Sequence, residues 1–389
     1  MSSNNSTRRL LILTNWYKPG FRAGGIITTM TNFVGVLRND FEIFVVTGDR
    51  DHKDNNAYQS VRMNEWIRTD GSTTYYAGPG HLTFRKLKSL MLGVRPDIIL
   101  LNGVFPYRFT ILPLLVLKFG VIRSRVFLLP HGMLMASALQ FKSQKKRLFL
   151  WIFRVCHFHK DVIFLCSTVA EEESVKAIFG AKVQTVSLPH FTMVPTSSPR
   201  KILKMPGMVR LIFIGRIHPI KNLATLLTSL VGLSDEVFLT IVGQVEDEDY
   251  LRLCMKIVEE LSPNITVQFV SEVAPQELHS LIGEHHFLAL PTTGENFGYA
   301  IFECLCLGRP VIISDQTPWR NLKECKVGWD VSLNDIELYR IALTEAISQT
   351  QVEYSEWQVA ANNYAHDFVS NSNLRRKYFD LLLAEPMKS

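Results

Sequence analysis

The chain has 389 residues, which is enough for two domains of ordinary size. Hydrophobic residues make up 47% and charged residues 20%, a balance typical of a globular protein with sizeable cores. The net charge is +6, but residues 1–200 hold 26 Lys and Arg against 12 Asp and Glu, a local charge of +14. Residues 201–389 hold 16 against 24, a local charge of −8, so we expect the first half to face an anionic surface or substrate. No nucleic-acid motif accompanies the basic half, and no nucleic-acid partner is expected.

The cysteines and the apolar segments argue against a secreted or membrane-spanning protein. None of the six cysteines belongs to a C-x-x-C motif, which argues against a zinc site and favours reduced thiols in the cytoplasm. Arg8 and Arg9 precede a run of apolar residues that is too short for a signal peptide. The longest apolar region, 109–129, is interrupted by Pro113 and Lys118, whereas a membrane span needs about 20 mostly apolar residues.

Short apolar runs alternate with helical patterns through the first half of the chain. The expected strands are residues 10–14, 41–47, 98–102, 126–130 and 162–166. Thr168 and Glu171 have the spacing of a capping box that opens a helix after the last of these runs. This alternation predicts a parallel α/β sheet.

Two of these strand ends carry residues suited to ligand contact. The loop after the first strand holds Arg22, a candidate for anion contact, and then Gly24 and Gly25, which would let the backbone approach a ligand closely. His131 follows the run 126–130 and is itself followed by a glycine. A plain turn would also use glycines, and a lone histidine often makes a structural hydrogen bond. Their place at carboxyl strand ends favours ligand contact.

A basic, aromatic segment follows at residues 141–154, where Lys and Arg alternate with Trp, Phe and Leu at helical spacing. Basic amphipathic helices of this kind often lie on anionic membranes. The alternative is a helix packed on the core with a solvated basic end, and the pattern gives the two about equal weight. The positive charge of the first half tilts the interpretation toward an anionic membrane surface, and so toward a peripheral place on the cytoplasmic face of the inner membrane.

A Pro-, Ser- and Thr-rich stretch at residues 189–206 predicts a linker between two domains. We therefore predict an N-terminal domain over residues 1–192, a second α/β domain over residues 207–350 and C-terminal helices over residues 351–389. The tail has helical periodicity with large apolar anchors such as Trp357 and Tyr378.

The second domain opens with a strand, a glycine turn and a basic loop. The apolar run 209–214 precedes Gly215, Arg216 and Lys221, and a helical pattern begins at Leu223. Both cations would lie at the carboxyl end of a strand, where ligands bind in open α/β sheets. A planar guanidinium and a compact ammonium both suit a diphosphate, although two solvated surface cations are the ordinary alternative.

A later strand end carries two acids. The apolar run 286–290 leads into a loop with Glu295, and Glu303 lies in the helix that starts after Gly298. The backbone N–H groups of residues 297–299 would open that helix and cradle a phosphate group. An ordinary salt bridge is the alternative, but the two cations of the preceding loop make a nucleotide-sugar site the better interpretation.

In these residues the chain resembles the retaining glycosyltransferases of family 4, which have the GT-B architecture. The family pattern includes a Gly-Arg turn followed by a lysine, present here at residues 215–216 and Lys221. It also includes a Glu-x7-Glu pair around a Phe-Gly turn, present as Glu295 and Glu303 around residues 297–298. The resemblance is specific over about residues 205–330 and looser elsewhere.

The resemblance implies a fold and a metal-independent reaction. The fold class would be α/β of the GT-B type: two Rossmann-like domains with parallel sheets facing a central cleft, and C-terminal helices crossing back to the first domain. Short acidic triplets at 49–51 and 247–249 could suggest a metal site. The second opens a helix, where acids are favourable anyway. Because Arg216 and Lys221 can neutralise a diphosphate, no metal and no other cofactor is expected.

The resemblance also implies roles for single residues. Arg216 and Lys221 would hold the diphosphate, Glu303 the ribose hydroxyls and Glu295 the sugar. Other expected contacts with the substrates are Gly24, Gly25, His131, Asn296, Phe297 and Gly298. One departure stands at Pro189-His190-Phe191, where family members often have Pro-Asn-Gly, so the domain join or the acceptor side is expected to differ.

We therefore predict a retaining hexosyltransferase that moves a sugar from a nucleotide diphosphate donor to a lipid-linked or oligosaccharide acceptor. Bacterial surface polysaccharide, O-antigen or capsule, is the expected product. A GT-B epimerase that frees the sugar without an acceptor is one alternative. A non-catalytic subunit that only binds a nucleotide sugar is another, and the intact acidic and basic residues argue against it.

Overall fold

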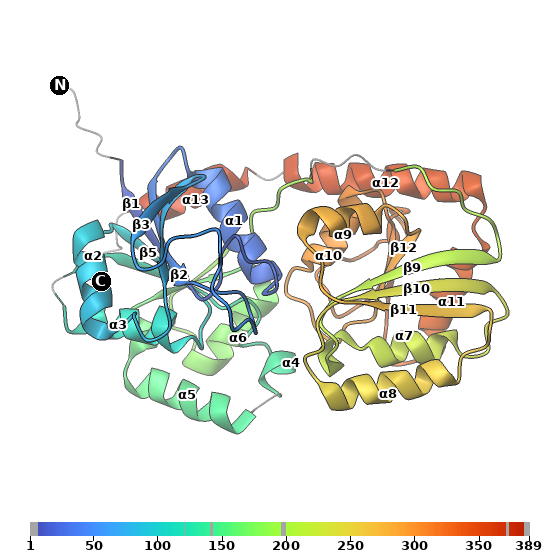
Figure 1. Cartoon of the computed structure of the whole chain (residues 1–389), viewed down its shortest axis with the longest axis horizontal. Helices are drawn as coiled ribbons and strands as arrows, with labels where there is room; N and C mark the ends of the chain where they lie inside the picture. The colour runs from blue at the N-terminus through green and yellow to red at the C-terminus, as the bar shows by residue number, and fades with distance from the viewer. Residues whose placement is uncertain (1–6, 121, 141–142, 196–199, 371–372, 385–389) are drawn as a thin grey trace. The chain divides into compact units, whose positions relative to one another are not determined.

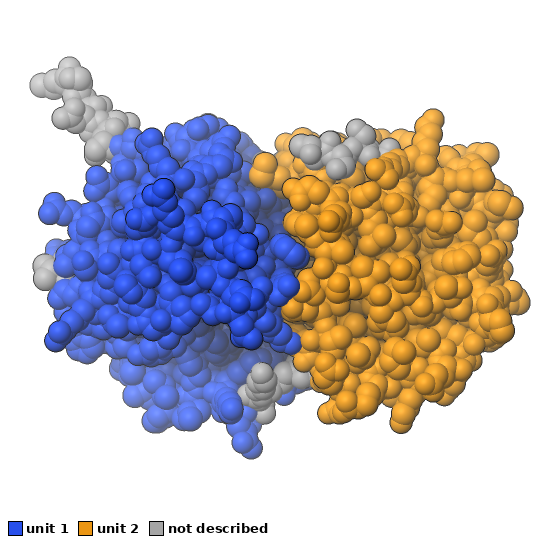
Figure 2. Space-filling view, viewed as in Figure 1, with its two compact units in different colours: residues 1–192, 373–389 blue, residues 193–372 orange. Residues whose placement is uncertain are grey.

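The computed structural model describes residues 7–120, 122–140, 143–195, 200–370 and 373–384. The chain forms two compact units, shown in Figures 1 and 2: unit 1 contains residues 1–192 and 373–389, and unit 2 contains residues 193–372. The boundary falls within the linker predicted at 189–206, of which residues 196–199 lie outside the described part of the chain.

Unit 1 is built on an eight-stranded sheet with the order β3-β4-β2-β1-β5-β6-β7-β8. Its strands are β1 (Arg9–Thr14), β2 (Glu42–Gly48), β3 (Trp66–Thr69), β4 (Ser72–Ala77), β5 (Ile98–Asn102), β6 (Arg125–Leu129), β7 (Ile163–Cys166) and β8 (Thr185–Ser187). Neighbouring strands are parallel, except that β3 and β4 form an antiparallel hairpin. The five strands predicted for this half are confirmed.

Helices cover both faces of the unit 1 sheet. They are α1 (Gly25–Leu37), α2 (Phe84–Val94), α3 (Leu112–Lys118), α4 (Ala136–Leu139), α5 (Ser143–Val155), α6 (Val169–Phe179) and α13 (Leu374–Leu383), with short turns of other helix types at Tyr107–Ile111 and Phe158–Lys160. In β1, Leu11 and Leu13 enter one core, whereas Leu10 and Ile12 enter the other. Burial on both faces explains why the strands read as continuous apolar runs rather than as alternating ones.

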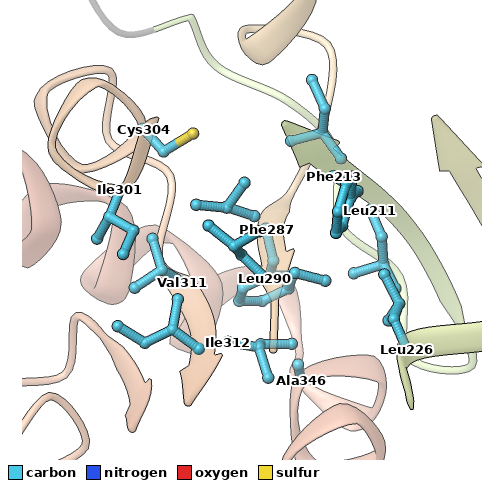
Figure 3. Packing of buried hydrophobic residues seen from close by; sticks show 14 of the residues in the cluster. Leu211, Phe213, Leu226, Phe287, Leu290, Ile301, Cys304, Val311, Ile312 and Ala346 are labelled. Carbon is cyan, nitrogen blue, oxygen red and sulfur yellow. The ribbon is translucent and has the colours of Figure 1, made fainter. Parts of the chain in front are cut away.

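Unit 2 is built on a six-stranded parallel sheet with the order β11-β10-β9-β12-β13-β14. Its strands are β9 (Met208–Ile214), β10 (Glu236–Val242), β11 (Ile265–Val270), β12 (Phe287–Leu290), β13 (Val311–Ser314) and β14 (Gly328–Val331). Its helices are α7 (Leu223–Leu230), α8 (Glu248–Glu259), α9 (Pro275–Ile282), α10 (Tyr299–Cys306), α11 (Ile336–Ser348) and α12 (Gln351–Ser370), with a 3-10 turn at Pro219–Lys221. Figure 3 shows its core, where Leu211, Phe287 and Val311 from three adjacent strands pack together.

The C-terminal helices are divided between the units. Tyr354 and Ala361 of α12 are buried in the unit 2 core, so this helix stays with unit 2. Helix α13 returns to unit 1, where the Tyr378 ring lies 5.4 Å from that of Phe33 and 4.4 Å from that of Phe191. Of the described residues in the predicted tail 351–389, those of α12 therefore belong to unit 2 and those of α13 to unit 1.

No helix among the described residues combines the length and the apolar character that crossing a membrane requires. The region 109–129, examined above for this reason, contains the short helix α3 and the strand β6.

Candidate functional site

The loops after β9 and β12 meet at the carboxyl edge of the unit 2 sheet. The two strands are neighbours, with Leu211 level with Phe287. Arg216 and Lys221 follow β9, and Glu295 follows β12, so the sheet order brings the predicted cations and the first acid to one edge. The Ile220 carbonyl ties the loops together, because it accepts hydrogen bonds from the Thr293 N–H at 2.8 Å and from Thr292 Oγ1 at 2.9 Å.

Lys221 and Glu295 form an ion pair at this edge. Lys221 Nζ lies 2.5 Å from Glu295 Oε2, and the two side chains are 16% and 18% exposed. The lysine stem passes over Gly215, where an added Cβ would lie 3.3 Å from Lys221 Cγ. Glycine therefore gives the stem the space to reach the acid. Two residues that the sequence predicted to share a site are in contact.

Arg216 has a different partner in this structure. Its Nη1 contacts Glu246 Oε2 in the loop after β10, and a bridge between Ile217 and Val245 holds the two loops together. The Arg216 side chain is 48% exposed, so this ion pair is worth about 0–1 kcal/mol. The Glu246 carboxylate would therefore compete only weakly with an anionic ligand for Arg216.

We predict that Glu246→Gln tightens the binding of a nucleoside diphosphate by about two- to fivefold, because the competing carboxylate is removed. Titration calorimetry of the purified chain with nucleoside diphosphates measures the change. Glu248→Gln is a matched control, since Glu248 is exposed at the start of α8, two residues further along. Unchanged or weaker binding to Glu246→Gln would show that Glu246 does not compete for Arg216.

The turn at residues 296–298 is held in place by packing and by backbone geometry. Phe297 is buried, and its carbonyl accepts a hydrogen bond of 2.6 Å from Trp319 Nε1. Gly298 has φ +84°, and an added Cβ would lie 2.8 Å from Ile301 Cδ1 and 3.1 Å from Glu295 Cγ. A side chain at 298 would thus strain the backbone and push on Glu295. The Oδ1 atom of Asn296 is buried and has no hydrogen-bond partner among the described residues, as expected of an acceptor left for a ligand.

Glu303 lies in α10, which Gly298 caps at its N-terminus. Burial raises the pKa of its carboxyl group to about 7. About a fifth of the side chain stays exposed, and Oε2 lies 4.0 Å from His279 Nε2 of α9. Burial lowers the pKa of His279, so near neutral pH the pair is not a strong ion pair. No local pattern singles out His279, because its approach to Glu303 depends on how α9 and α10 pack.

In unit 1, His131 ends a chain of polar contacts across three strand ends. Its Nε2 contacts Asn102 Oδ1, and Asn102 Nδ2 donates a 2.8 Å hydrogen bond to Thr14 Oγ1. Because the Asn102 oxygen can only accept, the His131 proton sits on Nε2 and leaves Nδ1 as an acceptor. Burial, with a smaller effect from His190, lowers the pKa of His131 well below its usual value. The imidazole is therefore neutral and suited to binding a hydroxyl group.

Two unit 1 residues near His131 were not predicted to belong to the site. The His190 ring lies 5.2 Å from the His131 ring, and its buried Nε2 has no hydrogen-bond partner among the described residues. Glu171 is fully buried, and its carboxylate accepts hydrogen bonds from the Gly132 N–H and from the Ser167 N–H at 2.7 Å. The capping-box prediction is confirmed only for Thr168, whose Oγ1 accepts from the Glu171 N–H at 3.2 Å. The Glu171 carboxylate instead fixes the backbone next to His131.

We predict that Glu171→Gln lowers the free energy of unfolding by about 2–3 kcal/mol, because an amide cannot replace a buried carboxylate that accepts several N–H bonds. Chemical denaturation of the full chain measures the loss. Glu173→Gln in the same helix is the control, since Glu173 is exposed. Equal stability of the two variants would rule out a structural role for the Glu171 charge.

The glycine loop of unit 1 is held by Asp51. Asp51 Oδ2 accepts hydrogen bonds from the N–H groups of Phe21 and Arg22 at 2.7 and 3.0 Å. Arg22 Nη1 also lies 3.3 Å from Asp54 Oδ2. Gly24 has φ +57°, and a Cβ there would meet nothing within 4 Å, so the loop presents bare backbone to open space beside Gly25. This is the arrangement expected of a backbone that contacts a ligand closely.

The acidic triplets have structural partners in this fold. Asp51 holds the glycine loop, Asp49 pairs with Arg50 at 2.9 Å, and Asp247 Oδ1 caps α8 by accepting from the Tyr250 N–H. Across the described ranges, no three or more His, Cys, Asp and Glu side chains are grouped so as to hold a metal ion.

Comparison with known proteins supports a transferase. Residues 197–351 match the family model described as glycosyl transferases group 1, which includes all the unit 2 site residues named above. No curated protein matches the chain in sequence.

Several solved structures share the whole architecture. Sucrose-phosphate synthase from Thermosynechococcus elongatus has a TM-score of 0.67 at 13% identity, covering 97% of this chain and 98% of that one. HepE from Anabaena, in complex with UDP and glucose, has a TM-score of 0.67 at 12% identity, with 96% and 99% covered. WaaG, a glycosyltransferase involved in lipopolysaccharide biosynthesis, has a TM-score of 0.66 at 13% identity, with 97% and 100% covered. The chain therefore has the two-domain GT-B fold, and its second unit carries the group 1 glycosyltransferase match.

Proposed function

We propose that the chain is a retaining glycosyltransferase of the family 4 type, which moves a hexose from a nucleotide diphosphate donor to a lipid-linked or oligosaccharide acceptor. The observation that carries the proposal is the contact between Lys221 and Glu295 at the carboxyl edge of the unit 2 sheet. A cation for the diphosphate and an acid for the sugar stand side by side there, within the segment that matches the group 1 family model. The UDP of the HepE structure supports uridine diphosphate as the donor nucleotide to test first.

In the proposed reaction the bond between the sugar's anomeric carbon and the phosphate oxygen breaks, and the nucleoside diphosphate leaves. The acceptor hydroxyl oxygen forms the new bond on the same face of the sugar, and its proton passes to the departing phosphate oxygen. No covalent intermediate and no metal is needed. Lys221 and Arg216 stabilise the negative charge that grows on the diphosphate, and the N–H groups at the start of α10 assist.

The remaining site residues bind and orient the substrates in this proposal. Glu303 accepts hydrogen bonds from the ribose hydroxyls, and Glu295 orients the sugar. The buried Asn296 Oδ1 finds its partner in the donor. In unit 1, neutral His131 binds a sugar hydroxyl, and the bare backbone at Gly24 approaches the donor phosphate and the acceptor.

We further propose that the enzyme works in the cytoplasm on bacterial surface polysaccharide, O-antigen or capsule. The free state of all six cysteines supports a reducing compartment. The likeness in fold to WaaG and the basic first half support a glycolipid or glycan acceptor.

A thermal-shift screen of nucleotide sugars tests the donor assignment, because a ligand that binds only the folded chain raises its unfolding temperature. The donor that stabilises the chain is then incubated with candidate acceptors, and the product's anomeric configuration is read by NMR. Arg216→Ala and Glu303→Ala should each abolish transfer while both variants still unfold cooperatively, as a folded chain does. Undiminished turnover by Arg216→Ala would remove the diphosphate assignment.

The same assay separates the two alternatives. An epimerase would consume the donor and release free sugar with no acceptor present. A binding subunit would be stabilised by the donor without turning it over under any acceptor. Transfer that requires an acceptor contradicts both.

A further inference from the structure

Helix α5 carries a row of apolar side chains on its solvent-facing side. Leu148, Trp151, Ile152 and Val155 are 59%, 61%, 46% and 53% exposed. Their spacing of three, four and seven residues places them on one face of the helix. Large apolar side chains grouped in this way on a surface mark an interaction site, unlike scattered single ones.

This row is not the face by which α5 packs on unit 1. Leu150 and Phe153 lie on the other side of the helix and are buried in the core. The Phe153 ring contacts those of Phe158 and Phe179 at 5.5 and 5.6 Å. A helix already anchored by one apolar face normally shows polar residues on the opposite one. The structure thus removes core packing as the reason for the outer row; residues 141–142 of the segment discussed above lie outside the described part of the chain.

The C-terminal end of α3 lies beside the C-terminal end of α5. Lys118 Nζ donates a 2.6 Å hydrogen bond to the Cys156 carbonyl, which joins the ends of α3 and α5 (both labelled in Figure 1). Phe119 follows directly and is 71% exposed. We call Leu148, Trp151, Ile152 and Val155 the α5 face.

The segment of the chain that carries the α5 face is basic. Residues 98–160, which contain α3, α4 and α5, hold ten Lys and Arg and no Asp or Glu. Lys145, Arg147 and Arg154 of α5 are exposed. An exposed apolar row on a helix that carries Lys145, Arg147 and Arg154 and no acid is suited to a surface that is both apolar and anionic.

We propose that the α5 face docks on a lipid bilayer that contains anionic lipids, with Trp151 and its apolar neighbours entering the interface and the flanking cations contacting the headgroups. A second copy of this chain fits less well, because a symmetric contact through this face would bring two acid-free basic segments together. The proposal concerns unit 1 and does not depend on the transferase assignment.

Co-sedimentation of the full-length chain with vesicles tests the proposal. We expect binding to vesicles of phosphatidylcholine mixed with phosphatidylglycerol, and little binding to phosphatidylcholine alone. Binding should weaken when the salt concentration rises from about 0.1 M to about 1 M, because the screening length falls from about 10 Å to about 3 Å.

Two pairs of substitutions separate the apolar and the charged contributions. Leu148→Ser with Trp151→Ser should weaken binding at least about tenfold, since two interfacial anchors are lost. Leu203→Ser with Val359→Ser is the matched control, because these side chains are 69% and 61% exposed in unit 2. Arg147→Gln with Arg154→Gln should weaken binding roughly fivefold per residue, whereas Arg62→Gln with Arg376→Gln, away from the face, should have little effect.

A fluorescence readout reports on the depth of Trp151 itself. The wild-type emission should shift to the blue on anionic vesicles, and Trp151→Phe should bind about as well while losing most of that shift. Circular dichroism and thermal unfolding establish that each variant is folded.

Three results would overturn the proposal. The first is equal recovery of the wild type with anionic and neutral vesicles. The second is unchanged vesicle binding by the Leu148→Ser, Trp151→Ser chain. The third is a wild-type dimer in light scattering that Trp151→Ser dissociates, without vesicle binding, which would assign the face to a protein contact.

Discussion

Replacing Lys221 with methionine should lower kcat by about 10²- to 10³-fold and raise the donor KM much less. The ammonium group lies beside Glu295 in a largely shielded position, where a positive charge acts strongly on a departing diphosphate. Negative charge grows on the diphosphate as the sugar–phosphate bond breaks, so its interaction with the Lys221 ammonium is stronger in the transition state than in the ground state. Steady-state kinetics with the donor found by the thermal-shift screen measure both constants.

Lys323→Met is the matched control for this experiment. Lys323 also pairs with a glutamate of unit 2, at 2.8 Å from Glu345, but its side chain is 61% exposed and belongs to a different part of the unit. Its replacement should leave kcat within about twofold, as expected for a surface ion pair. A Lys221→Met chain with wild-type kcat would separate Lys221 from leaving-group stabilisation.

Glu303→Gln should abolish a pH dependence of stability and lower kcat/KM for the donor by about 10²-fold. In the folded chain the pKa of Glu303 is raised to about 7 from the ordinary value of 4.5. The stabilisation of the folded chain by the Glu303 carboxyl group is therefore fully present below about pH 4.5. It is lost as the pH rises to about 7, because Glu303 ionises at lower pH in the unfolded chain than in the folded one. The loss amounts to about 2–3 kcal/mol for the wild type and to none at this position in the variant.

Denaturation at pH 5 and pH 8 tests this difference, with the buffer ionic strength held constant. Relative to the wild type, the Gln variant should gain stability at pH 8. Glu337→Gln, on an exposed part of α11, should not reproduce the gain. The affinity for the donor is a second measurement. The wild type should bind the donor more tightly as Glu303 ionises above about pH 7, because a carboxylate can accept hydrogen bonds from both ribose hydroxyls. A parallel pH profile in wild type and variant would contradict the role of Glu303.

What sequence could predict was mainly the position of side chains relative to strand ends. Arg216, Lys221 and Glu295 follow apolar runs that the structure confirms as β9 and β12, and parallel strands end at a common edge. The same logic located His131, which follows β6. These positions follow from local patterns and one topological rule.

Partners set by tertiary packing were out of reach. Glu171 reaches Gly132 across 39 residues, and Glu246 reaches Arg216 across 30, and neither spacing has a local signature. Glu171 even carried a misleading one, since its capping-box position describes its backbone and not its carboxylate. The hairpin of β3 and β4 is a different case, because Asp70 and Gly71 at its turn are a known hairpin signal that the predicted strands left out.

The return of α13 to unit 1 has a consequence for biosynthesis. Translation delivers residues 1–192 first. The second core of unit 1 also needs Tyr378 and Leu382, which leave the ribosome only at the end. Unit 2 is continuous in sequence and can finish folding earlier. In a nascent or prematurely stopped chain, Phe33 and Phe191 therefore lack the cover of Tyr378, and the second core of unit 1 is completed only when α13 has been made.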